Sequence, residues 1–399
     1  MRGRKLGLSM AVLEAAMATA LAVTLGGCSP KAQTVEQPAV KAEPIKIGAI
    51  VSLTGTYAGL GDPEKKTIEM EVARINEAGG INGRPVEVIF EDDATDEAKA
   101  VTAATRLIDQ DGVIALIGAT GSGQTMAVRG EVDRAKIPQV SLAGATAITK
   151  IFDPLVFATP WSNTIVAPFT LEALKKAGLT KVGLITDSGG FGKDGREVVK
   201  AEAAKQGIDI VSDQTFNPGD TDMTAQLTKI KNSGAQVLLM WTAGAEAATI
   251  VKSADQLGLD MPVYGSHGNA RKELIDGAGP AAEGFRFAAG KILVPAAYGV
   301  DTDAYKVATD FVTRYKAAYG DAPSTFAGHA YDALYLITEA ASRVQGDLTP
   351  AALRDEIEKT NGFVGIGGTF TMSPTDHNGL SVNDLTMYEV KDGTWQTVK

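Results

Sequence analysis

The sequence predicts an α/β protein of two similar lobes, each a doubly wound, Rossmann-like parallel sheet. Three observations support this. From residue 45 onwards, apolar β-branched runs alternate with stretches of helical period. The order of these elements repeats in the second half of the chain, and 399 residues exceed what one compact core usually holds. Continuous apolar strands separated by helices are typical of a parallel sheet that is covered on both faces.

The first lobe begins after a polar, Pro-rich stretch. Its expected strands and helices alternate along the chain: strands Ile45–Leu53, Val86–Phe90 and Val113–Gly118, with helices Glu64–Ala78 and Glu97–Gln110 between them. In folds of this kind ligands gather at the carboxyl ends of the strands. A cleft between two such lobes is therefore the expected ligand site.

The second lobe repeats this order. Lys46–Ile50 is echoed by Lys181–Ile185, and Val113–Gly118 by Val237–Thr242. The expected elements that follow are two helices and three strands: Ala304–Ala318, Phe326–Ser342, Gly368–Met372, Leu385–Val390 and Trp395–Val398. We expect 45–161 plus 297–368 to form lobe 1, and 162–296 plus 369–399 to form lobe 2.

The N-terminus has the composition of an export signal. Basic residues precede an apolar stretch, Leu6–Leu25, and small residues precede Cys28, the only cysteine. Leu25-Gly26-Gly27-Cys28 resembles the cleavage box of bacterial lipoproteins, which implies removal of 1–27 and lipidation of Cys28. The alternative is a retained membrane helix, but Glu14 interrupts the apolar run. Residues 28–44 are expected to be a flexible tether.

The composition disfavours several function classes. A net charge of -10 argues against a nucleic-acid partner, which needs a basic footprint. Three histidines without paired metal-ligand spacing give no metal site. No G-x-S-x-G sequence is present for a serine hydrolase. We expect neither catalysis, metal nor cofactor.

Two glycine-rich patterns follow predicted strands. Gly118–Thr125 fits the nucleotide-binding P-loop except that Gln124 replaces the lysine which contacts the phosphates. A glycine turn at a helix N-terminus still offers free N–H groups to a carboxylate, and Ser122 adds a hydroxyl; the alternative is a turn needed only for packing. Gly190–Gly195 fits a dinucleotide pattern, or a turn that starts a helix close to the cleft.

The three histidines receive different interpretations. His267 directly follows an apolar strand-like segment, where a ligand contact is expected, although a turn histidine bonded to backbone is the alternative. His329 lies in a helical run and is expected to be structural. His377 lies in the polar turn Pro374–Gly379 and is expected to face solvent.

A set of short motifs resembles the leucine/isoleucine/valine-binding proteins, the type I periplasmic binding proteins of ABC importers. The motifs run in order from about Ile45 almost to the C-terminus: Ile47-Gly48 through Gly55, Asn76–Gly83, Glu91–Asp93, Leu116–Gly118 with Ser122, Ile137–Gln139, Gln256–Leu259, Ala282–Gly284 and Tyr331–Leu334.

The resemblance implies two lobes joined by a hinge of three crossovers, closing on a ligand that is passed to an ABC permease. It places the ligand carboxylate at Ser122 and the amino-acid head group at the loop Ala143-Gly144-Ala145-Thr146, where either Ala145 or Thr146 takes the threonine-like position. Phe191 supplies an aromatic ring from the second lobe. Leu60 stands in place of the family's first-loop tyrosine, with Tyr57 three residues earlier.

His267 is a departure from this family. Branched-chain amino-acid binders place a glutamate there to pair with the ligand ammonium, and a neutral histidine cannot supply that charge. The sequence therefore predicts a secreted, lipid-anchored, monomeric importer subunit for an amino acid or another small carboxylate. The alternative is a sensing module that presents an aromatic or aliphatic acid to a receptor.

Overall fold

The computed structural model describes residues 42–398. The predicted signal 1–27, the lipidation site Cys28 and nearly all of the tether 28–44 lie outside these residues. Within the described range, every helix is too short or too polar to cross a membrane.

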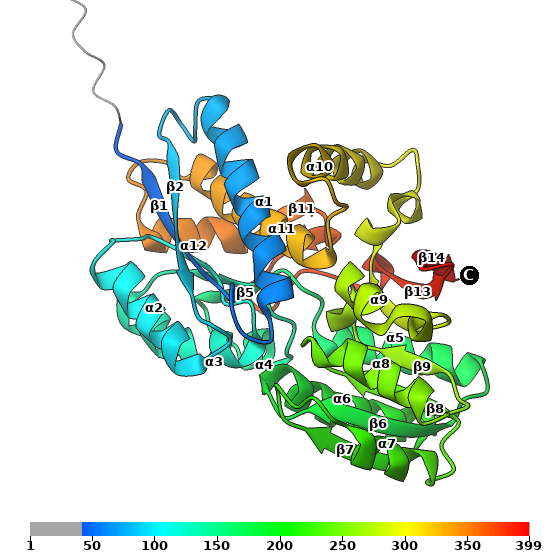
Figure 1. Cartoon of the computed structure of the whole chain (residues 1–399). Helices are drawn as coiled ribbons and strands as arrows, with labels where there is room; N and C mark the ends of the chain where they lie inside the picture. The colour runs from blue at the N-terminus through cyan, green and yellow to red at the C-terminus, as the bar shows by residue number, and fades with distance from the viewer. Residues whose placement is uncertain (1–41, 399) are drawn as a thin grey trace, which may run out of the picture. The chain divides into compact units, whose positions relative to one another are not determined.

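The first lobe is built on a five-stranded parallel sheet (Figure 1). Its order is β2-β1-β3-β4-β5, and the strands are β1 (Ile45–Val51), β2 (Val86–Asp92), β3 (Leu116–Gly118), β4 (Gln139–Ser141) and β5 (Val156–Ala158). Side chains of β1 alternate between two cores: Ile47 and Ala49 pack on one face, and Ile50 packs on the other. The sheet is therefore covered on both sides, as predicted.

Four helices follow these strands: α1 (Ala58–Glu77), α2 (Glu97–Asp109), α3 (Ser122–Ala135) and α4 (Ala147–Lys150). The α1 helix starts six residues before the predicted start at Glu64. The prediction was late because Gly59, Gly61 and Pro63 are poor helix formers by local propensity. Gly61 has a packing reason: a Cβ there would lie 2.1 Å from the carbonyl oxygen of Ser52. Close contact between α1 and the end of β1 requires glycine at this position.

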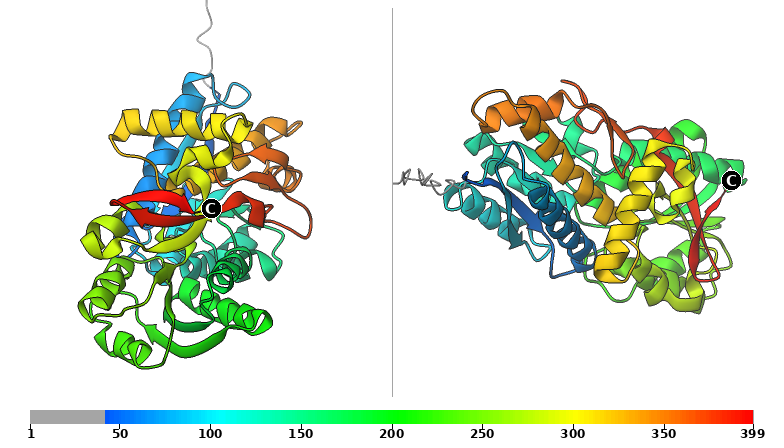
Figure 2. Two further views of the ribbon diagram at one scale, coloured as in Figure 1. Left: turned by 90° about the vertical axis from the view of Figure 1, so that its right-hand side faces the viewer. Right: turned by 90° about the horizontal axis from the view of Figure 1, so that it is seen from above.

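The second lobe repeats the arrangement. Its sheet has the order β14-β13-β10-β9-β8-β6-β7, from β6 (Lys181–Asp187), β7 (Asp209–Phe216), β8 (Val237–Trp241), β9 (Val263–Gly265), β10 (Arg286–Gly290), β13 (Leu385–Lys391) and β14 (Thr394–Val398). The run β7-β6-β8-β9-β10 is parallel and matches the order of the first sheet. The predicted echoes are confirmed, because β1 and β6, and likewise β3 and β8, occupy equivalent places. Figure 2 shows the antiparallel pair β13–β14 in red at the edge.

The remaining helices divide between the lobes: α5 (Asn163–Lys176), α6 (Gly190–Gln206), α7 (Thr224–Lys231), α8 (Glu246–Gln256) and α9 (Lys272–Ala278), then α10 (Asp303–Tyr319), α11 (Thr325–Arg343) and α12 (Pro350–Glu358). The α11 helix packs on α1, so the chain has returned to the first lobe. The hairpin of β11 (Asn361–Val364) and β12 (Thr369–Thr371) follows.

The chain passes between the lobes three times, as predicted: between β5 and α5, between β10 and α10, and between β12 and β13. The lobe boundary predicted between residues 368 and 369 falls inside the β11–β12 hairpin, whose strands pair with each other.

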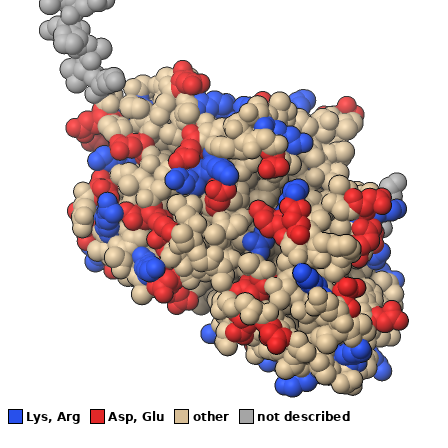
Figure 3. Space-filling model, viewed as in Figure 1, with Lys and Arg blue, Asp and Glu red and all other residues tan. Residues whose placement is uncertain are grey.

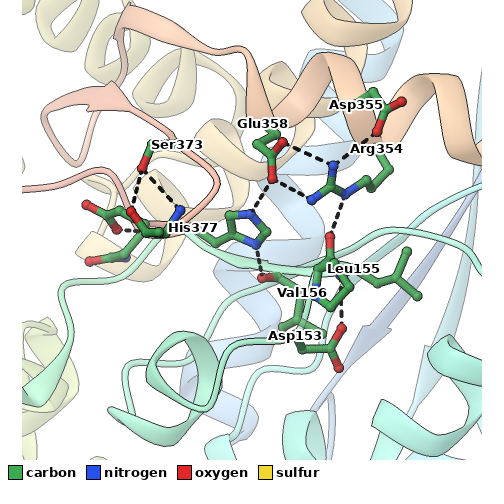
Figure 4. Close-up of polar contacts among 12 residues, drawn as sticks. Asp153, Leu155, Val156, Arg354, Asp355, Glu358, Ser373 and His377 are labelled. Atoms are coloured by element: carbon green, nitrogen blue, oxygen red, sulfur yellow. Dashed lines mark hydrogen bonds and ion pairs between the residues drawn. The ribbon is translucent and has the colours of Figure 1, made fainter.

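The expectation that His377 faces solvent is wrong. Its side chain is buried, stacks on Phe157 at 4.1 Å between ring centroids, and bonds through Nδ1 to the Val156 carbonyl at 3.0 Å. Its Nε2 lies 3.1 Å from Oε1 of Glu358, which also pairs with Arg354 (Figure 4). The polar turn folds back over β5, so the histidine attaches the start of the chain's third passage to the first lobe.

Charged side chains of both signs are interspersed on the face shown in Figure 3. Many pair along a helix or between neighbouring helices, as Lys176 does with Glu172 at 2.7 Å and Arg134 with Asp109 at 3.0 Å. Exposed pairs of this kind contribute little to stability. The lobes are therefore held mainly by their apolar cores.

Candidate ligand-binding site

A small cavity lies where the carboxyl ends of both sheets face each other. Residues from both lobes line it: Tyr57, Leu60, Thr120, Gly121, Ser122, Leu142, Ala143, Gly144, Pro160, Phe191, Ala243, His267, Gly268, Phe326 and His329. Seven of the nine predicted contact residues are among them.

Ser122 is the first residue of α3, directly after the glycine turn that ends β3. No side chain caps this helix and no acidic residue lies in its first turn, so its leading N–H groups are free of a side-chain partner. The Ser122 hydroxyl is buried, and its oxygen accepts a hydrogen bond from the Ala145 N–H at 3.2 Å. The hydroxyl hydrogen and the helix N-terminus can both serve a bound anion.

The predicted head-group loop only partly reaches the cavity. Ala143 and Gly144 line it, whereas Ala145 and Thr146 do not. The Thr146 N–H donates to Oδ2 of Asp194 in the second lobe at 2.8 Å, so this loop joins the lobes directly. The predicted ligand contact by Ala145 or Thr146 has no support from this placement.

The second lobe contributes Phe191 and His267, whose rings meet edge to face at 5.1 Å. His267 follows β9, as predicted, and the hydroxyl of Ser266 and the side chain of Asn269 close the turn around it. A Cβ on Gly144 would lie 2.7 Å from Nε2 of His267. Glycine at that position therefore lets the histidine approach the opposite lobe.

Phe326 and His329 come from α11 and were not predicted as site residues. They are three positions apart, so they share one helix face. His329 contacts Phe326 and Trp161 edge to face, at 6.0 and 5.3 Å between centroids. The available sequence signal was a histidine three positions after an aromatic residue in a largely apolar part of the chain.

The described residues that line the cavity include no Asp, Glu, Lys or Arg. Burial lowers the pKa of His267 to about 3, and the backbone of Trp161 offsets part of this shift. Burial, with a smaller effect of His267, lowers the pKa of His329 to about 3. Both imidazoles are therefore neutral near pH 7.

The two glycine-rich patterns meet across the cleft. A Cβ on Gly190, the first residue of α6, would lie 2.6 Å from the backbone nitrogen of Gly123 in α3. Within α6, a Cβ on Gly192 would lie 2.2 Å from the Asp187 carbonyl, and one on Gly195 would lie 2.0 Å from the Trp241 ring. These glycines permit close packing, which is the alternative given for the dinucleotide pattern.

The geometry of two facing lobes, three crossovers and a cavity at their strand ends agrees with the family comparison. A model of the periplasmic binding protein family matches residues 44–394. The chain belongs to this family. Proteins of this family bind ligands outside the cytoplasm. This chain is a type I periplasmic binding protein of the leucine/isoleucine/valine-binding group.

Relatives of this periplasmic binding protein cover nearly its whole described length. The Leu/Ile/Val-binding protein homolog 3 of Brucella melitensis is 29% identical over 88% of this chain and 92% of its own. The leucine-, isoleucine-, valine-, threonine- and alanine-binding protein of Pseudomonas aeruginosa is 26% identical over 90% and 93%.

Solved structures have the same fold. An extracellular ligand-binding receptor from Rhodopseudomonas palustris HaA2 has a TM-score of 0.83 at 28% identity, covering 89% of this chain and 99% of that one. The branched-chain amino acid transporter substrate binding protein of Streptococcus pneumoniae, in complex with isoleucine, has a TM-score of 0.79 at 28% identity, with the same coverage.

Proposed function

We propose that this protein is the extracytoplasmic substrate-binding subunit of an ABC importer. It captures a small carboxylate, an amino acid of the branched-chain type or a related acid, and delivers it to a membrane permease. The observation that supports this most directly is the interlobe cavity, where Ser122 and the α3 N-terminus face Phe191 and His267. The relatives named for binding leucine, isoleucine and valine support the ligand class.

Capture proceeds by closure of the lobes. The ligand carboxylate binds first to the open first lobe, at Ser122 and the leading N–H groups of α3. The second lobe then closes with Phe191 and His267 over the ligand body. Contacts made only on closure, such as the Thr146 N–H with Asp194 at 2.8 Å, give the permease a distinct shape to recognise.

Binding without turnover is the proposed outcome. A hydrolytic triad would need a carboxylate to orient a histidine, and the described residues around the cavity offer none. The ligand should be recovered unchanged from the protein.

The protein acts at a membrane surface in this proposal. Residues 1–27 are removed, Cys28 carries lipid, and 28–44 tether a monomeric binding body. No cofactor or metal takes part.

Thermal unfolding of the purified protein against a panel of amino acids and small carboxylates tests the function. A ligand at about 100 times its Kd adds about 2.7 kcal/mol of stability, which raises Tm by several degrees. Ser122→Ala should weaken binding of the ligand that raises Tm by about tenfold or more, because the hydrogen bond from the Ser122 hydroxyl to the ligand carboxylate is lost. If every amino acid and carboxylate leaves Tm unchanged, the proposed function is wrong.

A further inference from the structure

Two histidines from different parts of the fold face the same cavity. His267 follows β9 in the second lobe, and His329 lies in α11 of the first. Their exposed fractions are 6% and 3%. Three of their ring nitrogens have no hydrogen-bond partner among the described residues: Nδ1 and Nε2 of His267, and Nδ1 of His329. The Trp161 backbone lies close enough to His267 to affect its pKa but does not meet hydrogen-bond geometry with it. Buried polar atoms of this kind normally have a partner, and a bound ligand can supply it.

The cavity offers no countercharge for an ammonium group. The lining consists of apolar, glycine, hydroxyl and imidazole groups. Two buried carboxylates near the cleft are not among the lining residues. Glu64 accepts from the Thr120 hydroxyl and Asp187 from the Gly189 N–H at 2.8 Å, and the second oxygen of each has no partner among the described residues. An ammonium enclosed here would lose its water without gaining an anion.

A neutral imidazole offers one donor and one acceptor. Two such rings can donate to a carbonyl oxygen, or donate to and accept from a hydroxyl. They lie among Phe191, Phe326 and Leu60, which suit an aliphatic or aromatic body. The free N–H groups at Ser122 remain for a carboxylate at the other end.

We propose, resting on the function proposed above, that the ligand is a small carboxylic acid without an ammonium group, with a hydroxyl or carbonyl oxygen bound by His267 and His329. This class comprises 2-hydroxy and 2-keto acids with a branched aliphatic or phenyl body. His329 is a specificity residue on the same footing as His267.

Isothermal titration with two matched sets of three compounds tests the proposal. The sets are L-leucine, 2-hydroxy-4-methylpentanoate and 4-methyl-2-oxopentanoate, and L-phenylalanine, 3-phenyllactate and phenylpyruvate. Within a set only the group on the second carbon changes. The hydroxy or keto acid of at least one set should bind at least about 100-fold tighter than its amino acid, because an unpaired buried charge is strongly unfavourable.

Variants separate specificity from damage to the fold. His267→Glu should abolish binding of the keto acid and raise the affinity for L-leucine by about tenfold or more, because the glutamate supplies an anion for the ligand ammonium. His329→Leu should weaken binding of the hydroxy or keto acid by about tenfold. His329→Gln, which keeps a donor and an acceptor, should bind that acid with most of the wild-type affinity. His377→Gln, outside the cavity, is the matched control and should leave affinity unchanged.

The outcomes are distinguishable. Leucine or phenylalanine binding as tightly as its hydroxy and keto analogues overturns the inference while the proposed function stands. If none of the six compounds binds, the inference is wrong for acids with a branched aliphatic or phenyl group. The wider thermal unfolding panel then tests the proposed function on its own. Equal affinities in wild type, His329→Leu and His329→Gln remove His329 from the site.

Discussion

Acidification should destabilise the ligand-free protein through the two cavity histidines. Burial lowers the pKa of His267 and of His329 from the ordinary 6.5 to about 3. Between these values the unfolded chain binds protons that the folded protein does not. Stability therefore rises with pH across this window, and it is lost as pH falls below 6.5.

The magnitude follows from proton linkage. Between about pH 7.5 and pH 5.5, one histidine that ionises only in the unfolded chain costs about 1.4 kcal/mol, and the pair costs about 2.7 kcal/mol. The result depends little on the folded pKa, provided that this lies well below 5.5. Other groups titrate too, so the informative quantity is the difference between wild type and variants.

Urea unfolding at both pH values measures this difference. His267→Gln and His329→Gln should each reduce the acid-induced loss by about 1.4 kcal/mol, and the double variant by about 2.7 kcal/mol. NMR titration of the histidine C–H resonances should show both rings still neutral at the lower pH. An identical pH dependence in wild type and double variant would refute the reasoning, because the rings would then ionise in the folded state.

Three further predictions concern closure, the hinge side and the anchor. Gly190→Ala should weaken binding of 4-methyl-2-oxopentanoate by about tenfold or more, measured by calorimetry, because the added Cβ would lie 2.6 Å from the backbone nitrogen of Gly123. Gly130→Ala, whose added Cβ would have no described atom within 4 Å, is the control and should bind with unchanged affinity. His377→Ala should lower the free energy of unfolding by about 2–4 kcal/mol without changing affinity; an unchanged urea midpoint contradicts this. Cys28→Ser should move the protein from the membrane to the soluble fraction, and retention on the membrane would indicate another anchor.

The sequence predicted the parts of the site that follow from strand order. Ser122, Phe191 and His267 each come directly after a strand, and the carboxyl ends of parallel strands meet at one edge. Periodicity placed those strands and so placed Ser122 and His267 at the cleft, whereas Phe191 was expected there from the family resemblance. The contact roles of individual side chains stay predictions.

Residues placed by long-range packing were not predicted. His329 reaches the cavity because α11 packs on α1 after the second passage between lobes, and local periodicity cannot encode that return. His377 was assigned to solvent from its polar neighbours, yet the turn folds over β5, where its ring nitrogens lie 3.0 Å from the Val156 carbonyl and 3.1 Å from Oε1 of Glu358. Local composition describes a turn but not what the turn covers.

One end of the cavity is formed by backbone groups and the other by side chains, so amino-acid substitutions affect the second end more than the first. The end proposed to bind the carboxylate offers backbone N–H groups at the start of α3, which remain whatever side chains surround them. The other end is formed by side chains at Phe191, His267 and His329, and one substitution there changes charge or shape. A family with this division can keep one recognition element for acids while single residues in the second lobe and in α11 select the rest of the ligand. The histidine at position 267, where the family resemblance implies a glutamate, is expected to be a change of this second kind, so the fold alone does not specify the ligand.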